Sequence, residues 1–220
     1  MTGLRYVYAV CRPFGAPLQA QLAGVAGDPP RVLHHHGLVA VVSHVPERDF
    51  AEEPLRGHLE DLEWLTTTVR AHQSVIDALT VVTTPLPLRP GTVFRDDSGV
   101  RVMIEEREDG FRHTLDRLQG RVEWGVKMYA ETAVPVTEEL WQRAEAFATG
   151  LHEKLSAYAE DARLHPPQNS MLLNAAYLVP RRDSEEFVEM VDRTKGDLPG
   201  IRVELAGPWA AYSFAGEESP

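Results

Sequence analysis

Cysteine is almost absent from this sequence, and its scarcity limits the kinds of site that the chain can build. Cys11 is the single cysteine among 220 residues, so an intramolecular disulfide is excluded. A zinc site made of several thiolates is excluded for the same reason. Cys11 ends the apolar run 6–10, and this position favours a small buried side chain over a reactive thiol.

Basic residues and long apolar runs are also scarce. The 22 lysines and arginines are outnumbered by 33 aspartates and glutamates, which gives a net charge of −11. This balance argues against nucleic-acid binding, because the phosphate backbone requires a concentrated basic surface. No stretch approaches the roughly 20 apolar residues of a membrane span. The first residues lack the pattern of a signal peptide, so we expect a cytoplasmic protein or one attached to a structure inside the cell.

Several motifs of common enzymes are missing. The sequence contains neither of the glycine-rich phosphate-binding loops, GxxxxGK and GxGxxG. The nucleophile elbow GxSxG and the helical zinc pair HExxH are absent as well. We therefore expect a protein that uses no cofactor and catalyses no reaction.

Histidines provide the main alternative to that expectation. His34, His35 and His36 are consecutive, and neighbouring side chains of a strand point to opposite faces. The three imidazoles should therefore not reach one metal ion together, and a polar strand edge is expected. His72 lies on the apolar stripe of a predicted helix, which favours a buried neutral histidine. A histidine-dependent or metal-dependent enzyme of unknown substrate remains the alternative hypothesis.

The first 120 residues predict a mixed domain of strands and helices. A Val- and Tyr-rich strand is expected over 4–11, and the continuous apolar run 38–42 is typical of a central strand covered on both faces. Apolar residues three and four positions apart predict helices over 55–79 and 98–118. Between these helices, the three prolines of segment 81–94 allow only an edge strand or an extended loop.

After Gly120 the pattern predicts a ferredoxin-like domain. Trp124, Val126 and Met128 occupy alternate positions, the signature of a half-buried strand. The elements expected next are a helix to about 158, strands over 159–164 and 171–179, a helix over 183–195 and a last strand over 201–205. Their order is the split βαβ order. We therefore predict an α+β protein with an N-terminal domain 1–120, a ferredoxin-like domain 121–207 and a C-terminal tail 208–220.

Aromatic residues are concentrated in this tail. Trp209, Tyr212 and Phe214 follow the Gly207-Pro208 break within a few residues. Two interpretations remain open, because the aromatic side chains could fill a groove between the domains or form an apolar surface for a protein partner. Arg89, in the proline-rich segment, could likewise form an internal salt bridge or contact a partner.

Three segments resemble the GvpF/GvpL family of gas vesicle accessory proteins. PLPLRPGTVF at 85–94 is similar to the family's PLRFGTVF, with Pro90 where the family usually has an aromatic residue. EWGVKMY at 123–129 is similar to EWGVKVY, and LAGPWAAYSF at 205–214 is similar to LTGPWPPYSF. The opening strand and the NAAYLV strand at 174–179 fit too, so the resemblance spans essentially the whole chain.

This resemblance implies a function in the assembly of gas vesicles. It implies two α+β domains, the second ferredoxin-like, in a minor vesicle component that binds the hydrophobic shell protein GvpA and keeps it from aggregating during nucleation. The family has no established catalytic residues, so none are carried over, and we expect no metal-binding residues. A scaffold for other accessory proteins is an alternative. The residues expected to contact a partner are Arg89, Trp124, Lys127, Tyr129, Trp209, Tyr212 and Phe214.

Overall fold

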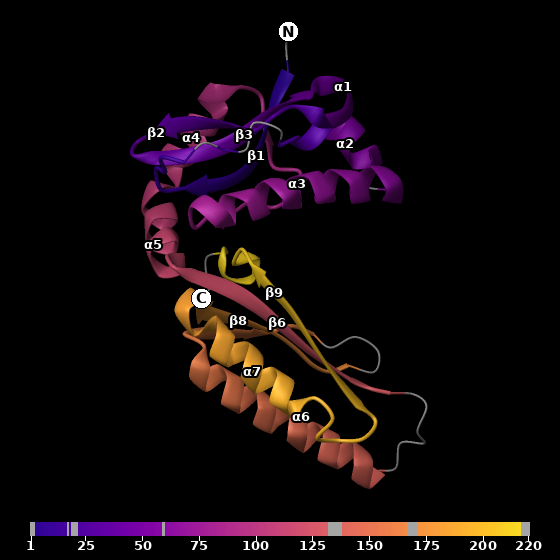
Figure 1. Cartoon of the computed structure of the whole chain (residues 1–220). Coiled ribbons are helices and arrows are strands. Elements are labelled where there is room, and N and C mark those ends of the chain that lie inside the picture. The colour runs from indigo at the N-terminus through magenta and orange to yellow at the C-terminus, as the bar shows by residue number, and fades with distance from the viewer. Residues whose placement is uncertain are drawn as a thin grey trace. The chain divides into compact units, whose positions relative to one another are not determined.

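A computed structural model describes residues 3–16, 18, 22–58, 60–131, 138–166 and 171–216. These residues divide into two compact units, one reaching Gln119 and the other spanning Gly120–Phe214. Each unit contains an antiparallel sheet with helices beside it (Figure 1). The mixture of helices and antiparallel sheets agrees with the predicted α+β class.

The sheet of the N-terminal unit is built around two buried strands. Its strand order is β2-β3-β1-β4, and β5 also pairs with β1. As predicted, β3 is central and the apolar residues 38–42 are buried, while the proline-rich segment supplies only two short strands. The bounds are β1 Gly3–Cys11, β2 Arg31–His35, β3 Leu38–Pro46, β4 Leu86–Pro87 and β5 Val93–Phe94.

Cys11 ends β1 and lies in the core of this unit. The side chain is fully buried, and burial raises the pKa of its thiol to about 12. A thiol with that pKa is almost entirely protonated at neutral pH, and the thiolate is the reactive form. The prediction of an inert buried cysteine is confirmed.

The helices of this unit are shorter than the sequence pattern suggested. The helix expected over 55–79 is two helices, because the Asp61 carboxylate accepts hydrogen bonds from the amides of Glu63 and Trp64 and starts a new helix there. The helix expected over 98–118 is also divided, at Arg107. The bounds are η1 Val25–Gly27, α1 Glu47–Phe50, α2 Glu52–His58, α3 Leu62–Val82, α4 Asp97–Glu106 and α5 Glu108–Leu118.

The elements of the C-terminal unit follow one another in the expected order of strand, helix, strand, strand, helix, strand. The strand order within the sheet is β7-β8-β6-β9, and α6 and α7 lie along the same face (Figure 1). The bounds are β6 Arg121–Ala130, α6 Glu138–Tyr158, β7 Asp161–Leu164, β8 Met171–Pro180, η2 Arg181–Asp183, α7 Ser184–Thr194, β9 Ile201–Trp209 and η3 Tyr212–Phe214.

The alternation predicted for β6 decides which of its side chains enter the core. Trp124, Val126 and Met128 belong to a buried cluster with Leu155 of α6 and Phe187 of α7. Glu123, Lys127 and Tyr129 therefore belong to the opposite face of the sheet, because successive side chains of a strand alternate. We call the face away from α6 and α7 the second sheet face.

The last strand is longer than the sequence pattern indicated. β9 continues through the cis Gly207–Pro208 peptide to Trp209, which lies opposite Glu123 of β6. The predicted end of the domain at residue 207 is therefore not the end of the strand. Residues 208–214 belong to the compact C-terminal unit, and the last four residues of the predicted tail lie outside the described residues.

None of the helices within the described residues combines the length and apolar character needed to cross a lipid bilayer.

Candidate partner-binding surface

Two of the predicted partner-binding residues are buried. Trp124 is 8% exposed and points toward α7, where its indole Nε1 donates a hydrogen bond to Ser184 Oγ over 3.2 Å. Phe214 is fully buried, and the guanidinium of Arg163 lies 5.5 Å from the centre of its ring. Both side chains pack inside the folded chain and offer little surface to a partner.

Lys127 and Tyr129 lie on the second sheet face. In the pairing of β6 with β9, Lys127 is opposite Glu204 and Tyr129 is opposite Arg202. The Arg202 guanidinium lies 4.7 Å from the centre of the Tyr129 ring and also forms an ion pair with Glu204. This part of the face is therefore charged and carries one aromatic ring.

The C-terminal segment is fixed at the other end of the same face. Glu123 accepts two hydrogen bonds from Ser213, one from its amide and one from its hydroxyl, both over 2.8 Å. Burial raises the pKa of the Glu123 carboxyl, although the two hydrogen bonds act to lower it. Glu123 was missed as a site residue because a lone acid on a strand gives no sign of a partner 90 positions away.

Trp209 is the exposed aromatic residue of the predicted tail. Its side chain retains 42% exposure, whereas Tyr212 is half-buried. Trp209 pairs with Glu123 across the two strands, and directly opposed residues share one face of a sheet. Trp209 therefore shares the second sheet face with Lys127 and Tyr129. We define these three residues with Arg202 and Glu204 as the open sheet face.

Arg89 belongs to the N-terminal unit and lies between β4 and β5. Its carbonyl oxygen accepts hydrogen bonds from the Thr92 amide and hydroxyl, at 3.2 and 2.7 Å. Its side chain is exposed and, within the part of the chain that the structure describes, forms no ion pair. A partner-binding role for Arg89 stays a prediction.

His72 is a core residue, as its position on the helical stripe predicted. It is 1% exposed, and its Nδ1 lies 3.0 Å from the hydroxyl oxygen of Tyr6. Burial lowers the pKa of His72 to about 4, so the imidazole is neutral at physiological pH. A neutral, sealed imidazole cannot reach a substrate, which removes His72 from the enzyme hypothesis.

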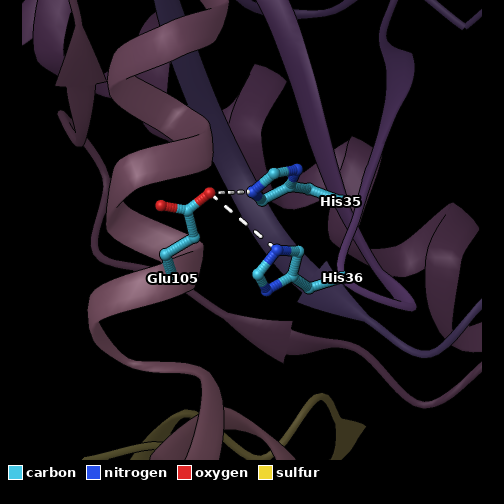
Figure 2. Close-up of side chains that lie close together, drawn as sticks. All are labelled: His35, His36 and Glu105. Carbon is cyan, nitrogen blue, oxygen red and sulfur yellow. Dashed lines mark hydrogen bonds and ion pairs between the residues drawn. The ribbon is translucent and has the colours of Figure 1, made fainter.

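The three consecutive histidines do not form the continuous strand that the sequence suggested. His35 is the last residue of β2, while His36 and Gly37 form the turn to β3 with φ angles of 48° and 68°. Because the chain leaves the strand at His36, the His36 ring stacks on the His35 ring, with ring centres 4.4 Å apart (Figure 2). The expectation that neighbouring histidines must diverge is therefore wrong for this pair.

Comparison with known proteins identifies the family. The model of the family described as gas vesicle synthesis protein GvpL/GvpF matches residues 4–135 and 132–216. The chain is 48% identical to Gas vesicle protein L of Streptomyces sp. strain CB03234, covering 97% of this chain and 93% of that protein. It is 28% identical to Gas vesicle protein F of the same strain, with 95% and 98% covered.

A solved structure shares the fold. The crystal structure of GvpF from Anabaena sp. PCC7120 superposes with a TM-score of 0.80 at 19% identity, covering 99% of this chain and 98% of that one. The fold therefore persists at a sequence identity where individual surface residues differ. The matching family model, the Streptomyces relatives and this shared fold show that the chain belongs to the GvpL/GvpF family of gas vesicle proteins.

Proposed function

We propose that this protein is a non-enzymatic assembly factor that binds the shell protein GvpA and limits its aggregation while gas vesicles nucleate. The observation that carries the proposal is the 48% identity, over nearly the whole chain, to a Gas vesicle protein L. The proposed location is the cytoplasm and the gas vesicle itself. Other gas vesicle accessory proteins are further candidate partners.

The comparison also favours an L role over an F role. The identity to protein L of the Streptomyces strain is 48%, against 28% to protein F of the same strain. Because both relatives come from one organism, the difference in identity does not reflect a difference between species. In a vesicle-forming bacterium, this chain should restore vesicles to a strain lacking L and not to one lacking F. Equal rescue of both strains would contradict the L assignment.

We further propose that the C-terminal unit is a ferredoxin-like split βαβ domain, as the sequence pattern predicted. Its chain order and its sheet order β7-β8-β6-β9 support this description. In such a domain the helices cover one face of the sheet and leave the other available. This arrangement makes the open sheet face the natural place for a partner.

The composition of the open sheet face suits a protein interface. Tryptophan, tyrosine and arginine are the residue types most enriched among binding hot spots. Trp209 offers an exposed indole, and the ring of Tyr129 is held in place by Arg202. Lys127 and Glu204 lie directly opposite each other on β6 and β9 and supply one charge of each sign. We propose that an apolar segment of GvpA docks on Trp209 and that the charges orient it.

Co-purification and light scattering test this proposal directly. GvpA refolded in the presence of the protein should scatter less light than GvpA alone, and the two chains should co-purify. Trp209→Ala should weaken binding by about 2 kcal/mol, roughly thirtyfold, as truncation of a hot-spot residue does.

A matched control separates this effect from a general loss of apolar surface. Leu164 of β7 is 63% exposed. It lies two positions after Ala162, which packs against the helix-side core, so both side chains belong to the face of the sheet that the helices cover. Leu164→Ala should therefore bind GvpA like the wild type, and circular dichroism should show both variants folded. Absence of GvpA binding would refute the proposal, and binding to other accessory proteins alone would favour the scaffold alternative.

A further inference from the structure

Two histidines and a glutamate meet in the N-terminal unit, where the β2–β3 turn reaches the last turn of α4 (Figure 2). His35 Nε2 lies 2.6 Å from Glu105 Oε1, and His36 Nε2 lies 3.9 Å from the same oxygen. One potential ligand atom from each residue falls within 4.8 Å of the other two. This grouping has no part in the open sheet face, which belongs to the other unit.

The backbone of the turn brings the two imidazoles together. Positive φ at two consecutive central residues defines the type I′ turn, whose twist matches a two-residue hairpin. Gly37 adopts such a conformation without steric cost, and His36 is held in it. Arg112 of α5 donates a hydrogen bond to the carbonyl of His36, which ties the turn to the helix. The backbone of the turn therefore holds the two imidazoles next to each other before any ligand binds.

A second carboxylate orients one of the imidazoles. Glu108 Oε2 lies 2.8 Å from His36 Nδ1, and Glu108 Oε1 accepts a hydrogen bond from Arg112. Metal-binding histidines usually donate their other ring N–H to such a carboxylate, which fixes the tautomer and strengthens the ligand. With Nδ1–H donated to Glu108, the lone pair of His36 Nε2 is directed to the side where Glu105 lies. The structure thus supplies an outer carboxylate as well as three inner ligands.

We propose that His35 Nε2, His36 Nε2 and a Glu105 carboxylate oxygen bind one Zn²⁺ ion. Two neutral imidazoles and one carboxylate are common ligands of this metal, whereas Ca²⁺ and Mg²⁺ require more oxygen atoms. Around a tetrahedral Zn²⁺ ion, metal–ligand bonds of about 2.0–2.1 Å separate the ligand atoms by roughly 3.3 Å. This value lies between the distances from Glu105 Oε1 to His35 Nε2 and to His36 Nε2, which are 2.6 and 3.9 Å. A metal ion lies in the plane of each imidazole that binds it, and the two rings are stacked with 19° between their planes, so binding also requires the His35 ring to turn as the Glu105 side chain moves. Water completes the coordination, because His36 and Glu105 are half exposed.

Binding at this site would join parts of the chain that are distant in sequence. The ligands come from the β2–β3 turn and from α4, 70 positions apart. The unfolded chain does not hold them together, so Zn²⁺ binds the folded state preferentially and stabilises it. We infer that the ion fastens the hairpin turn to the α4–α5 junction.

Calorimetric titration of the full chain with ZnCl₂ tests the site, using protein without a histidine tag. One ion should bind per chain and raise the thermal midpoint. His36→Asn removes the imidazole but suits positive φ, since asparagine populates that region more readily than most residues. This variant and Glu105→Gln should each weaken Zn²⁺ binding at least tenfold. Glu108→Gln should weaken it about tenfold, as loss of an outer partner does.

Two neighbours serve as matched controls. His34→Ala removes the adjacent exposed imidazole of β2, and Glu106→Gln removes the next exposed carboxylate of α4. Both should bind Zn²⁺ like the wild type. Histidine-ring NMR should show Zn²⁺-dependent shifts for His35 and His36 and none for His34. The proposal is overturned if the protein does not bind Zn²⁺, or if the controls lose as much affinity as the ligand variants.

Discussion

Buried polar residues contribute to stability in both units, and the contribution of His72 in the N-terminal unit depends on pH. The pKa of His72 is lowered to about 4, from an ordinary value of 6.5. Between these pH values the unfolded chain binds a proton that the folded chain does not. The folded state therefore loses stability as the pH falls through this window.

His72→Gln should flatten this dependence. Each pH unit contributes about 1.4 kcal/mol, so the free energy of unfolding attributable to His72 should fall by about 3 kcal/mol between pH 6.5 and pH 4. Glutamine stays neutral and keeps an acceptor for the Tyr6 hydroxyl. Urea unfolding at a series of pH values measures the slope. His44→Gln, at an exposed position, should retain the wild-type slope, and equal slopes in all three proteins would contradict the prediction.

Glu123 determines where the C-terminal segment lies on the second sheet face. Its carboxylate accepts both hydrogen bonds of Ser213, and Ser213 Oγ is also 3.4 Å from His165 Nε2. Glu123→Ala removes both acceptors and should cost about 1–3 kcal/mol. Hydrogen exchange of the Ser213 amide should become faster. Glu123→Gln keeps one acceptor and should have a smaller effect, and unchanged exchange in the alanine variant would argue against this anchoring role.

At the level of elements, two glycines of the C-terminal unit should respond in opposite ways to the same substitution. Gly207 of β9 has φ +131°, and an added Cβ would lie 2.8 Å from the Glu123 carbonyl oxygen and 2.9 Å from the Trp124 ring. Gly150 of α6 has open space at the corresponding point. Glycine is required at the first position and disfavoured in the helix at the second.

Gly207→Ala should therefore destabilise the protein, and Gly150→Ala should stabilise it. The cost at Gly207 combines backbone strain of about 1–3 kcal/mol with the displacement of neighbouring atoms. The gain at Gly150 should be about 0.5–1 kcal/mol, the usual difference between glycine and alanine in a helix. Chemical unfolding of both variants provides the comparison. A neutral Gly207→Ala would mean that β9 can shift away from β6 at low cost.

Element boundaries were the least predictable part of the fold. The apolar stripe continues across Asp61, so periodicity alone suggested one helix where there are two. The break depends on the Asp61 side chain capping α3, a local hydrogen bond that the apolar pattern does not report. The end of β9 was misplaced for a related reason. A Gly-Pro pair is typical of a chain break, but pairing of Trp209 with Glu123 continues the strand beyond it.

At the scale of the whole molecule, the acidic composition should govern solubility. With 33 acidic and 22 basic residues, the net charge of −11 keeps copies of the chain apart at neutral pH. The isoelectric point is about 5.3, where this repulsion disappears. Light scattering should therefore rise to a maximum near pH 5.3 and be low at pH 7.5. A scattering maximum at pH 7.5 would indicate that association is driven by a surface other than the charged one.

Local patterns in the sequence determined the class of most of the long elements and much of the core. Alternation placed Val126 inward and Lys127 outward, and the long apolar runs identified the buried strands β1 and β3. The family resemblance also rested on contiguous segments. These features were predictable because a strand or helix repeats over a few residues, so its pattern is written in neighbouring positions.

Only the tertiary structure decided which side chains meet across long separations. It buried Trp124 and Phe214 while leaving Trp209 exposed, although all three had seemed equivalent partner-binding aromatics. It joined Glu123 to Ser213 and brought His35 and His36 to Glu105. No local pattern encodes these contacts, because they depend on strand pairing and helix packing between segments 70 to 90 positions apart. The sequence by itself determined the elements and the family, and the packing of those elements decided the surfaces available for binding.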